Sequence, residues 1–369
     1  MRVLIVKRDK LGDLLLTTPV LRHLAEARPD AEIHLLANDY NAWVARGHPA
    51  IARTWTYPRV RDGRRLRLSA AFAQVPVALA LRRQRFDAAL VMGGDESPRA
   101  IRRTLAVAAS RVIAYAADAR RYGGRLVDAL PVPAEGHEID RMMALLAPLG
   151  VAPPARTAHP DYALPAEDAA FARAWLATRG LAPSRYVVIG LGARKPKKQP
   201  STEQIVRWSD RLLREHGLHT VFMWTPGGRD AGRYPGDDDI AASVVARALA
   251  HVHPFRGPIP QALGLIFHAR TSIVPDSGLM HFAAASPGGV LGLFADPADS
   301  APASRWAPRG ARASFIEAEK RVSEVRDEVV WAELEPLLAP HTSPSPRFAG
   351  RGIASVKASL SPRAGRGLA

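Results

Sequence analysis

Short apolar runs alternate with amphipathic runs along the first 130 residues. The runs that have the length and composition of buried strands are Val3–Val6, Glu32–Ala37, Ala88–Met92 and Arg111–Tyr115. Between the first two of them, residues 12–28 have the pattern of a helix, which Pro29 and Asp30 would end. Strands that alternate with helices indicate parallel βαβ units. The first part of the chain therefore predicts an α/β domain built on a parallel sheet.

A second alternation of the same kind begins at Tyr186. The expected strands are Tyr186–Gly190, Thr220–Trp224, Thr271–Pro275 and Val290–Phe294. The expected helices are Thr202–His216, Ile240 to about Ala250, and Glu324–Leu338. Two loops stand out, a basic one over Leu191–Pro200 and one rich in Gly and Asp over Pro226–Asp239. The pattern predicts a second βαβ domain of similar construction.

Changes in composition set the domain boundaries that we predict. Residues 1–150 form the first domain and residues 171–339 the second, with a linker rich in Pro and Ala over 151–170. From 340 to 369 the chain consists largely of Ser, Pro, Gly and Arg in an imperfect repeat, which predicts a disordered tail. This tail is either a basic anchor or an extension without function, and the composition favours the second.

The bulk composition is that of a soluble globular protein, with 47% hydrophobic and 23% charged residues among 369. There is no cysteine, which excludes disulfides, thiolate catalysis and cysteine-based zinc sites. The apolar run before Lys7 is too short for the core of a signal peptide, and no run approaches the length of a membrane span. We therefore expect a cytoplasmic protein.

The net charge of +16 is unevenly distributed. Residues 1–130 have 23 Lys and Arg against 12 Asp and Glu, residues 341–369 have five cations and no acid, and the part between them is neutral. The first domain is therefore expected to face something anionic: nucleic acid, a membrane surface, or a phosphorylated or acidic acceptor. The alternative is that the charge serves solubility alone.

The segment with the clearest chemistry lies between the expected strand Thr271–Pro275 and the helix that follows it. It reads Asp276, Ser277, Gly278, Leu279, Met280, His281. Free backbone N–H groups at the start of a helix can bind an anion, and a glycine lets that anion approach closely. A carboxylate, a hydroxyl and a histidine one turn later add groups that can bind a sugar. The segment is typical of a site for a diphosphate and a sugar.

Asp13 occupies the corresponding position in the first domain, where the first strand has ended and the first helix begins. Ligands bind at the carboxyl edge of a parallel sheet, and a carboxylate there can act as a general base on an acceptor hydroxyl. Alternatively, Asp13 only caps the helix, because acids favour helix N-termini. The residues alone do not decide between these two interpretations.

The loop after Tyr186–Gly190 has four cations: Arg194, Lys195, Lys197 and Lys198. Cations placed opposite a helix N-terminus can neutralise a leaving diphosphate, which typically lowers a barrier by several kcal/mol. The alternative is an ordinary solvated loop. It is not a Walker A loop, since the Gly-Lys-Ser/Thr ending is missing.

Together these motifs resemble glycosyltransferase family 9, the ADP-heptose:lipopolysaccharide heptosyltransferases. The segments that are similar to the family's motifs are Leu11-Gly12-Asp13 with Thr17-Thr18-Pro19, then His137-Glu138-Ile139-Asp140-Arg141, Lys197-Lys198-Gln199-Pro200, and Asp276 to His281. In order and spacing the resemblance spans about residues 1–320.

The resemblance implies two facing Rossmann-like domains of the GT-B type and an inverting sugar transfer that requires no metal or other cofactor. Asp13 matches the family's catalytic base and Lys197 its phosphate-binding lysine. Ser277, Gly278 and the amides after them, Leu279 and Met280, would hold the donor diphosphate, while Asp276 and His281 would line the donor pocket. Further candidate contacts with the donor or acceptor are Gly12, Thr17, Arg194, Lys198, Arg59, Arg61 and Arg64.

Three departures from the family pattern concern the donor. Gln199 stands where the family usually has Trp, and Phe294-Ala295-Asp296-Pro297 replaces a more common ending of that strand. The loop Pro226–Asp239 looks longer than usual, and Asp230 or one of Asp237–Asp239 could contact the donor ribose. The identity of the donor sugar therefore stays open.

The expected function is transfer of heptose from ADP-heptose to an anionic, lipid-linked lipopolysaccharide core acceptor. The enzyme would be peripheral on the inner face of the cytoplasmic membrane, with the basic first domain toward the acceptor and the lipid. One alternative is a related transferase with another nucleotide-sugar donor or acceptor. Another is a non-catalytic protein that binds a nucleotide or nucleic acid, although no RNA-binding aromatic signature is present, so we expect no specific nucleic-acid partner.

Overall fold

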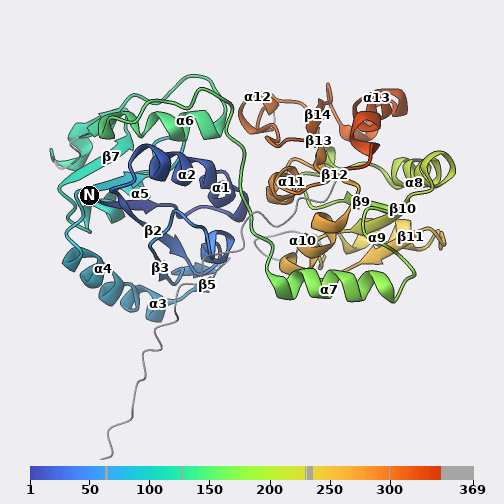
Figure 1. The fold of residues 1–369 in the computed structure, drawn as a ribbon, viewed down its shortest axis with the longest axis horizontal. Helices are drawn as coiled ribbons and strands as arrows, with labels where there is room; N and C mark the ends of the chain where they lie inside the picture. The colour runs from blue at the N-terminus through green and yellow to red at the C-terminus, as the bar shows by residue number, and fades with distance from the viewer. Residues whose placement is uncertain are drawn as a thin grey trace, which may run out of the picture.

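The computed structural model describes residues 1–341 except 63–64, 125, 127, 229, 231–235 and 299, and it describes 61–62 and 65–66 by their backbone alone. The predicted disordered tail, 340–369, lies outside the described residues from position 342 onward. The chain forms two α/β units side by side (Figure 1).

The first unit is built on a six-stranded parallel sheet of order β3-β2-β1-β6-β7-β8. Its strands are β1 Arg2–Val6, β2 Glu32–Asn38, β3 Arg53–Tyr57, β6 Ala88–Val91, β7 Arg111–Tyr115 and β8 Asp128–Leu130. The small antiparallel hairpin of β4 (Arg61–Asp62) and β5 (Arg65–Leu66) stands apart from this sheet. The order reverses between β1 and β6, which is the point where doubly wound folds bind ligands.

Six helices belong to this unit: α1 Leu11–Leu15, α2 Thr18–Ala27, α3 Leu68–Phe72, α4 Gln74–Arg83, α5 Pro98–Leu105 and α6 Glu138–Ala144. The single helix expected over 12–28 is therefore two helices, α1 and α2. Pro19 is the second residue of α2; its ring has no N–H and would clash with the carbonyl of Leu15 in one continuous helix.

The second unit repeats the same topology, with a parallel sheet of order β11-β10-β9-β12-β13-β14. Its strands are β9 Tyr186–Gly190, β10 His219–Met223, β11 Val252–Phe255, β12 Thr271–Pro275, β13 Val290–Phe294 and β14 Ala313–Glu317. Its helices are α7 Ala166–Ala177, α8 Thr202–His216, α9 Asp238–Val245, α10 Ile259–His268, α11 Gly278–Ala284, α12 Ala303–Trp306 and α13 Asp327–Leu338. The α/β class and the pair of Rossmann-like domains predicted from the sequence are confirmed.

Helix α8 has the bounds that the sequence predicted, and local signals explain both of its ends. Helix α8 begins at Thr202 because Ser201 caps it: its hydroxyl accepts the N–H of Gln204, and the Gln204 side chain accepts the N–H of Ser201. The helix ends at Gly217, whose φ of +61° lies in the left-handed region that glycine adopts without a steric penalty. Both signals are readable in the sequence.

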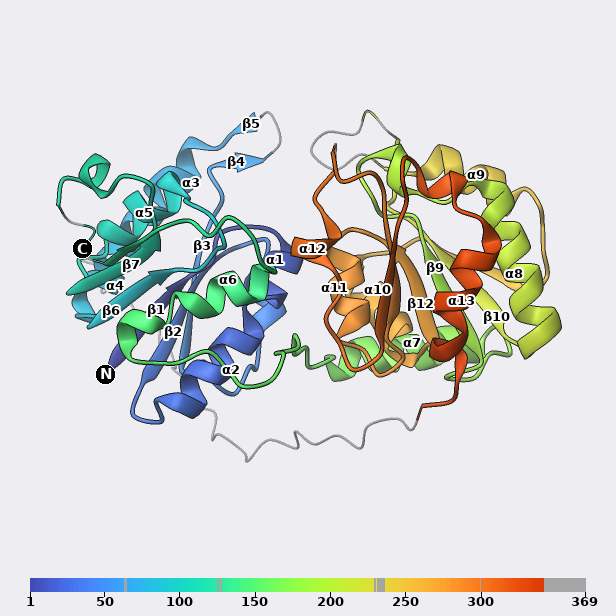
Figure 2. The ribbon, with the colours of Figure 1, turned by 90° about the horizontal axis from the view of Figure 1, so that it is seen from above.

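One hydrophobic cluster runs through both units and the segment between them. At its centre Trp43, in a short 3₁₀ turn after β2, stacks on Phe282 of α11 with ring centroids 6.0 Å apart. Tyr162, in the connecting segment, packs edge-on against Phe282 at 5.0 Å. Trp43, in η1 (Ala42–Ala45), is thus a packing residue, and the two units share a core where α1 meets α11 (Figure 2).

Helices α1 and α11 approach each other at two glycines. A methyl group on Gly12 would come within 2.9 Å of the Cα of Gly278 and 3.2 Å of the His281 ring. Only glycine at position 12 permits this backbone-to-backbone contact, so the start of the first helix lies directly on the turn after β12.

Among the described helices, none has both the length and the apolar character needed to cross a membrane.

Candidate active site

Asp13 lies in the first turn of α1, just beyond the carboxyl end of β1, and is partly exposed. Its Oδ2 atom accepts the backbone N–H of Lys10 at 2.9 Å, so the carboxylate does cap its helix. Thr17 donates its hydroxyl to the Asp13 carbonyl at 3.0 Å and fixes the end of the same turn. No described residue donates to Oδ1, which leaves one oxygen of the carboxylate for a substrate. Capping and general-base catalysis are therefore compatible.

Asp276, at the carboxyl end of β12, forms a buried ion pair with Lys198. Only 11% of each of the two side chains is exposed, so each charge has lost most of its water and depends on its partner. Lys198 thus reaches the turn at 276–278 from the basic loop, whereas its neighbour Lys197 is half-buried and Arg194 and Lys195 are exposed. The structure brings the basic loop and the Asp276 turn together, as expected, through Lys198.

The Ser277 hydroxyl and the His281 Nδ1 atom are both buried and have no hydrogen-bond partner in the described part of the chain. Ser277 is the N-cap of α11, yet it makes no capping hydrogen bond. Buried polar atoms in native proteins are nearly always paired, and those that are not often belong to a ligand site. Together with Gly278, these atoms form a polar surface at the start of α11 that a ligand can satisfy.

His281 is nearly fully buried, and burial lowers the pKa of its imidazole below the ordinary value. The carboxylates of Asp276, Asp13 and Glu138 act in the opposite direction. Because Gly12 packs against Gly278 and the His281 ring, Asp13 and Asp276 both lie near this imidazole, although they are 263 positions apart in the chain. The two motifs singled out in the sequence therefore form one site.

Gln199, which stands where the resembled family usually has Trp, is buried and holds the basic loop in place. Its side-chain amide donates to the carbonyls of Leu191 and Ala193, at 2.9 and 3.1 Å, and to Oδ1 of Asp237 at 2.7 Å. Its role here is to tie the loop after β9 to the segment before α9. An aromatic ring could not make these three contacts.

Four acids were candidates for a donor contact in the loop 226–239. Asp237 is buried and engaged with Gln199. Asp238 accepts from Trp224 Nε1 and from the guanidinium of Arg256, and these partners hold the pKa of its carboxyl well below the usual range. Asp230 and Asp239 are exposed. Asp237 and Asp238 thus have structural partners, and the choice among the four stays open.

Of the three candidate arginines in the first domain, Arg59, Arg61 and Arg64, the structure describes the side chain of Arg59 alone. Arg59 is described: it pairs with Asp39 at 3.1 Å, and its guanidinium lies over the Tyr40 ring at 4.6 Å. Arg61 is described by its backbone alone, in β4, and Arg64 lies outside the described residues. These three stay candidate acceptor contacts.

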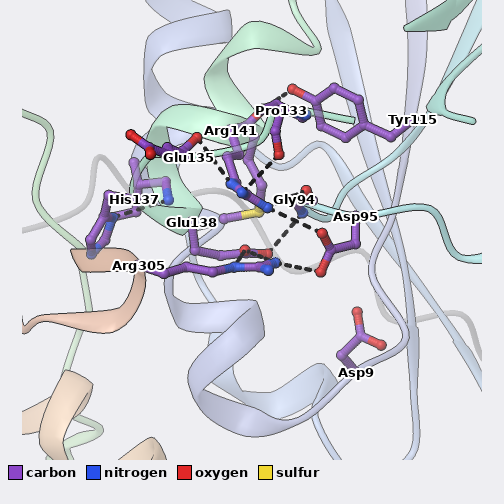
Figure 3. Close-up of polar contacts among 12 residues, drawn as sticks. Asp9, Gly94, Asp95, Tyr115, Pro133, Glu135, His137, Glu138, Arg141 and Arg305 are labelled. Carbon is purple, nitrogen blue, oxygen red and sulfur yellow. Dashed lines mark hydrogen bonds and ion pairs between the residues drawn. The ribbon is translucent and has the colours of Figure 1, made fainter. Parts of the chain in front are cut away.

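A network of ion pairs joins the two domains beside this site (Figure 3). Arg305 of α12 reaches across to the first domain, where its guanidinium donates to Glu138 at 2.7 Å and to Asp95 at 2.6 Å. Glu138 also accepts the Gly94 N–H at 2.8 Å, and Arg141 donates to Asp95 at 3.1 Å. A second bridge joins Arg309 to Asp140. We call these two groups, Arg305 with Glu138 and Asp95, and Arg309 with Asp140, the interdomain clasp.

His137 adds a neutral contact to this clasp. Its Nδ1 accepts the Ile139 N–H and caps α6, while its Nε2 donates to the Ala307 carbonyl of the second domain at 2.9 Å. Burial lowers the pKa of His137 to about 4. His137 and Asp140 therefore stabilise the contact between the two domains.

Sequence reasoning missed Lys7 and Arg305. Lys7 directly follows the apolar strand β1, is 1% exposed, and places its ammonium 3.5 Å from Asp9. A cation directly after a buried strand was a readable signal. Arg305 had none, because its partner Glu138 lies 167 positions away.

The arrangement can carry out one kind of chemistry well. The Asp13 carboxylate, which has a free oxygen, lies close to a turn that has two unpaired polar atoms, on Ser277 and His281, and a nearby lysine, Lys198. Such a site can take a proton from a hydroxyl on one side while neutralising an anionic leaving group on the other. Among the described residues, no cluster of three or more His, Asp or Glu is placed to hold a metal ion.

Comparison with known protein families gives a match over most of the chain. Residues 76–328 match the model of glycosyltransferase family 9 (heptosyltransferase). This match covers more than half of the chain and includes the clasp, the basic loop and the Asp276 turn. No curated protein matches the chain by sequence.

Solved structures with the same fold cover nearly the whole chain. The glycosyl transferase family 9 protein from Veillonella parvula has a TM-score of 0.74 and 18% identity, over 91% of this chain and 97% of that one. E. coli ADP-heptose lps heptosyltransferase II has a TM-score of 0.69 and 19% identity, over 92% and 98%. E. coli heptosyltransferase WaaC with ADP has a TM-score of 0.66 and 19% identity, over 91% of this chain and 100% of that one. At these identities the likeness shows the fold.

Proposed function

Because the chain belongs to glycosyltransferase family 9, we propose that this glycosyltransferase moves heptose from ADP-heptose to a lipid-linked, anionic lipopolysaccharide core acceptor. The observation that carries the proposal is the meeting of Asp13 with the Asp276–His281 turn across the two domains. The structures titled ADP-heptose lps heptosyltransferase II and WaaC with ADP share the fold over nearly their full length, which supports this donor.

In the proposed reaction, Oδ1 of Asp13 takes the proton of an acceptor hydroxyl as that oxygen attacks the anomeric carbon of the sugar. The bond between the anomeric carbon and the diphosphate breaks with its electron pair, and ADP leaves. Attack opposite the leaving group inverts the configuration. The acquired proton then passes from Asp13 to water. Asp13 suits this role since Lys10 holds its other oxygen and fixes the carboxylate.

The leaving diphosphate would lie at the start of α11. The unpaired Ser277 hydroxyl, the amides of Gly278 and Leu279 and the buried cation of Lys198 are the groups that can stabilise its charge. The Met280 amide, which the sequence also suggested, already donates to the Ser277 carbonyl at 3.2 Å. Lys197 and Arg194 lie on the same loop and stay candidate contacts. With these cations in place, we propose that transfer needs no metal ion.

The acceptor side would be the first domain, whose excess of cations suits an anionic saccharide at the inner surface of the cytoplasmic membrane. A related transferase with another nucleotide-sugar donor remains the second candidate. The observation that favours it is Gln199, which fills the usual Trp position with a loop-holding amide beside the donor turn.

The test is a panel of ADP-, GDP- and UDP-sugars, with release of nucleotide measured in the presence and absence of acceptor and of EDTA. We expect release from ADP-heptose alone among them, unchanged by EDTA. Asp13→Asn should lower kcat by about 10²- to 10⁴-fold, the usual contribution of a general base. It should leave ADP binding, measured by calorimetry, within about twofold.

Two results would count against this proposal. Transfer from UDP- or GDP-sugars but not from ADP-sugars would move the chain to the second candidate. Unchanged turnover in Asp13→Asn, with the variant still folded, would remove Asp13 from the base role.

A further inference from the structure

The most exposed large apolar side chains of the described chain lie on one stripe. They are Leu68, Phe72, Val75 and Leu79, which are 65%, 76%, 54% and 48% exposed. Other exposed apolar residues, such as Val245 and Phe315, are less exposed and lie on separate elements. The spacing of the four, at intervals of four, three and four, places them on one face of α3 and α4. We call this face the apolar stripe.

The opposite face of the same two helices is anchored in the first domain. Ala70 and Leu81 are buried, and Val77 packs on a cluster that contains Trp55 and Phe86. The apolar stripe is therefore held rigidly outward. Helices α3 and α4 lie on the outer layer of the first domain, below β3 in Figure 1, and the exposure of the four side chains shows that no described element covers the stripe.

The charge around the apolar stripe is unusually one-sided. The 14 residues from Leu68 to Leu81 contain no charged side chain, while residues 59–67 and 82–85 contain eight arginines against one acid, Asp62. Arg67 and Arg83, at the two ends of the helix pair, are both exposed. An uncharged apolar face flanked by arginines matches an interface in which apolar chains lie beneath anionic headgroups.

From these observations we propose that the apolar stripe docks this protein on an anionic lipid bilayer, with α3 and α4 in the plane of the surface. The pair of helices spans 16 residues, about 24 Å at 1.5 Å per residue, and one side of it is packed on protein, so it lies on the membrane rather than crossing it. This proposal deepens the peripheral location proposed above and rests on that function only for its biological setting.

Charge argues for a bilayer over the other occupants of such a face. A second copy docked by the same stripe would bring two sets of arginines together, which is unfavourable. Nucleic acid would pair its phosphates with the arginines, but the same phosphates would lie against the apolar side chains of Phe72 and Leu68, which is unfavourable. Hairpin β4–β5, which leads directly into α3, projects toward the second domain in Figure 2, so docking would also bring this candidate acceptor region to the lipid surface.

Vesicle binding of the full chain tests the proposal. We expect co-sedimentation with vesicles of phosphatidylethanolamine and phosphatidylglycerol, weaker binding in 0.5 M than in 0.1 M salt, and little binding to phosphatidylcholine. The double variant Leu68→Gln/Phe72→Gln should weaken partition by about tenfold or more. Arg83→Gln should weaken it about fivefold on anionic vesicles only. The matched control, Leu213→Gln/Val245→Gln, exchanges exposed apolar residues of the second domain and should bind as the wild type does.

Labelling gives a direct view of insertion because the chain has no cysteine of its own. An environment-sensitive dye on Phe72→Cys should brighten and shift to the blue on anionic vesicles, whereas the same dye on Leu213→Cys should not. Full vesicle binding by the stripe variant would overturn the proposal, as would absence of binding by the wild type. A dimer in solution that the stripe variant loses, without vesicle binding, would assign the surface to a second copy instead.

Failure of this proposal is separable from failure of the proposed function. Nucleotide release from ADP-heptose in solution, without vesicles, should be the same in the stripe variant and the wild type. Vesicle binding without any such release would leave the docking surface intact and remove the donor assignment.

Discussion

At the scale of single residues, the side chains of the proposed site also hold the local fold together. Asp13 gives one oxygen to the Lys10 amide and keeps the other. Lys198 neutralises Asp276 in a nearly dry pair. Gln199 ties its loop to Asp237. Each residue is fixed by a partner before any substrate arrives, which is the condition for preorganised catalysis.

His137 gives a prediction about pH. Its pKa is about 4 in the folded chain and about 6.5 when unfolded, so between these values the unfolded state binds the extra proton. Above pH 6.5 His137 does not reduce the free energy of unfolding. As the pH falls from 6.5 toward 4, its preference for the unfolded state lowers the free energy of unfolding by about 3 kcal/mol in total.

The measurement is urea unfolding at pH 7 and pH 4.5 of the wild type and of His137→Asn. Asparagine can still cap α6 through its side-chain oxygen but takes up no proton. The variant should therefore lose less stability over this range than the wild type. Equal losses in the two proteins would show that other groups cause the pH dependence.

At the scale of elements, the strands that the sequence predicted and those it missed differ in position. Every strand that the sequence missed in the two large sheets lies at an edge: β3, β8, β11 and β14. Central parallel strands are buried on both faces and form continuous apolar runs, while edge strands need not. Thus β3 reads Arg-Thr-Trp-Thr-Tyr, and β11 contains Pro254, a residue tolerated at a sheet edge.

The contact between α1 and α11 gives a prediction at this scale. Gly12→Ala would place a methyl group 2.9 Å from the Gly278 Cα, which forces the two helices apart. We expect a loss of about 1–3 kcal/mol in the free energy of unfolding and at least about tenfold in kcat/KM, because the displaced carboxylate follows the same helix. Gly93→Ala is the control, since a methyl group there meets nothing within 4 Å. Both variants would be compared by denaturant unfolding and nucleotide release.

At the scale of the whole molecule, the sequence predicted two domains and the residues that face each other, but not how the domains are held together. Motifs such as the Asp276 turn are local and therefore readable. The clasp joins positions up to 210 apart, and no local pattern marks Arg305 as its centre. The connecting segment adds further contacts, since Arg22 pairs with Asp161 and the Thr18 hydroxyl accepts the Asp161 N–H at 2.8 Å.

Breaking the clasp should therefore loosen the molecule without unfolding either domain. Arg305→Gln leaves the carboxylate of Glu138, which is 4% exposed, without its cation, and losing one partner of such a buried pair costs about 3 kcal/mol. We expect a larger radius of gyration by small-angle X-ray scattering and faster proteolysis of residues 152–165. The control, Arg247→Gln, breaks the exposed pair with Glu203 within one domain and should change neither. An unchanged radius in Arg305→Gln would mean that the shared core alone holds the domains together.

The backbone contact of Gly12 with Gly278 has a consequence for any relative motion of the two domains. If one domain rotates on the other about this point, each atom travels in proportion to its distance from it. Asp13 is the next residue after Gly12, and Ser277 the one before Gly278, so both would hardly move relative to each other. A rotation about this contact would therefore keep the proposed base beside the proposed donor turn.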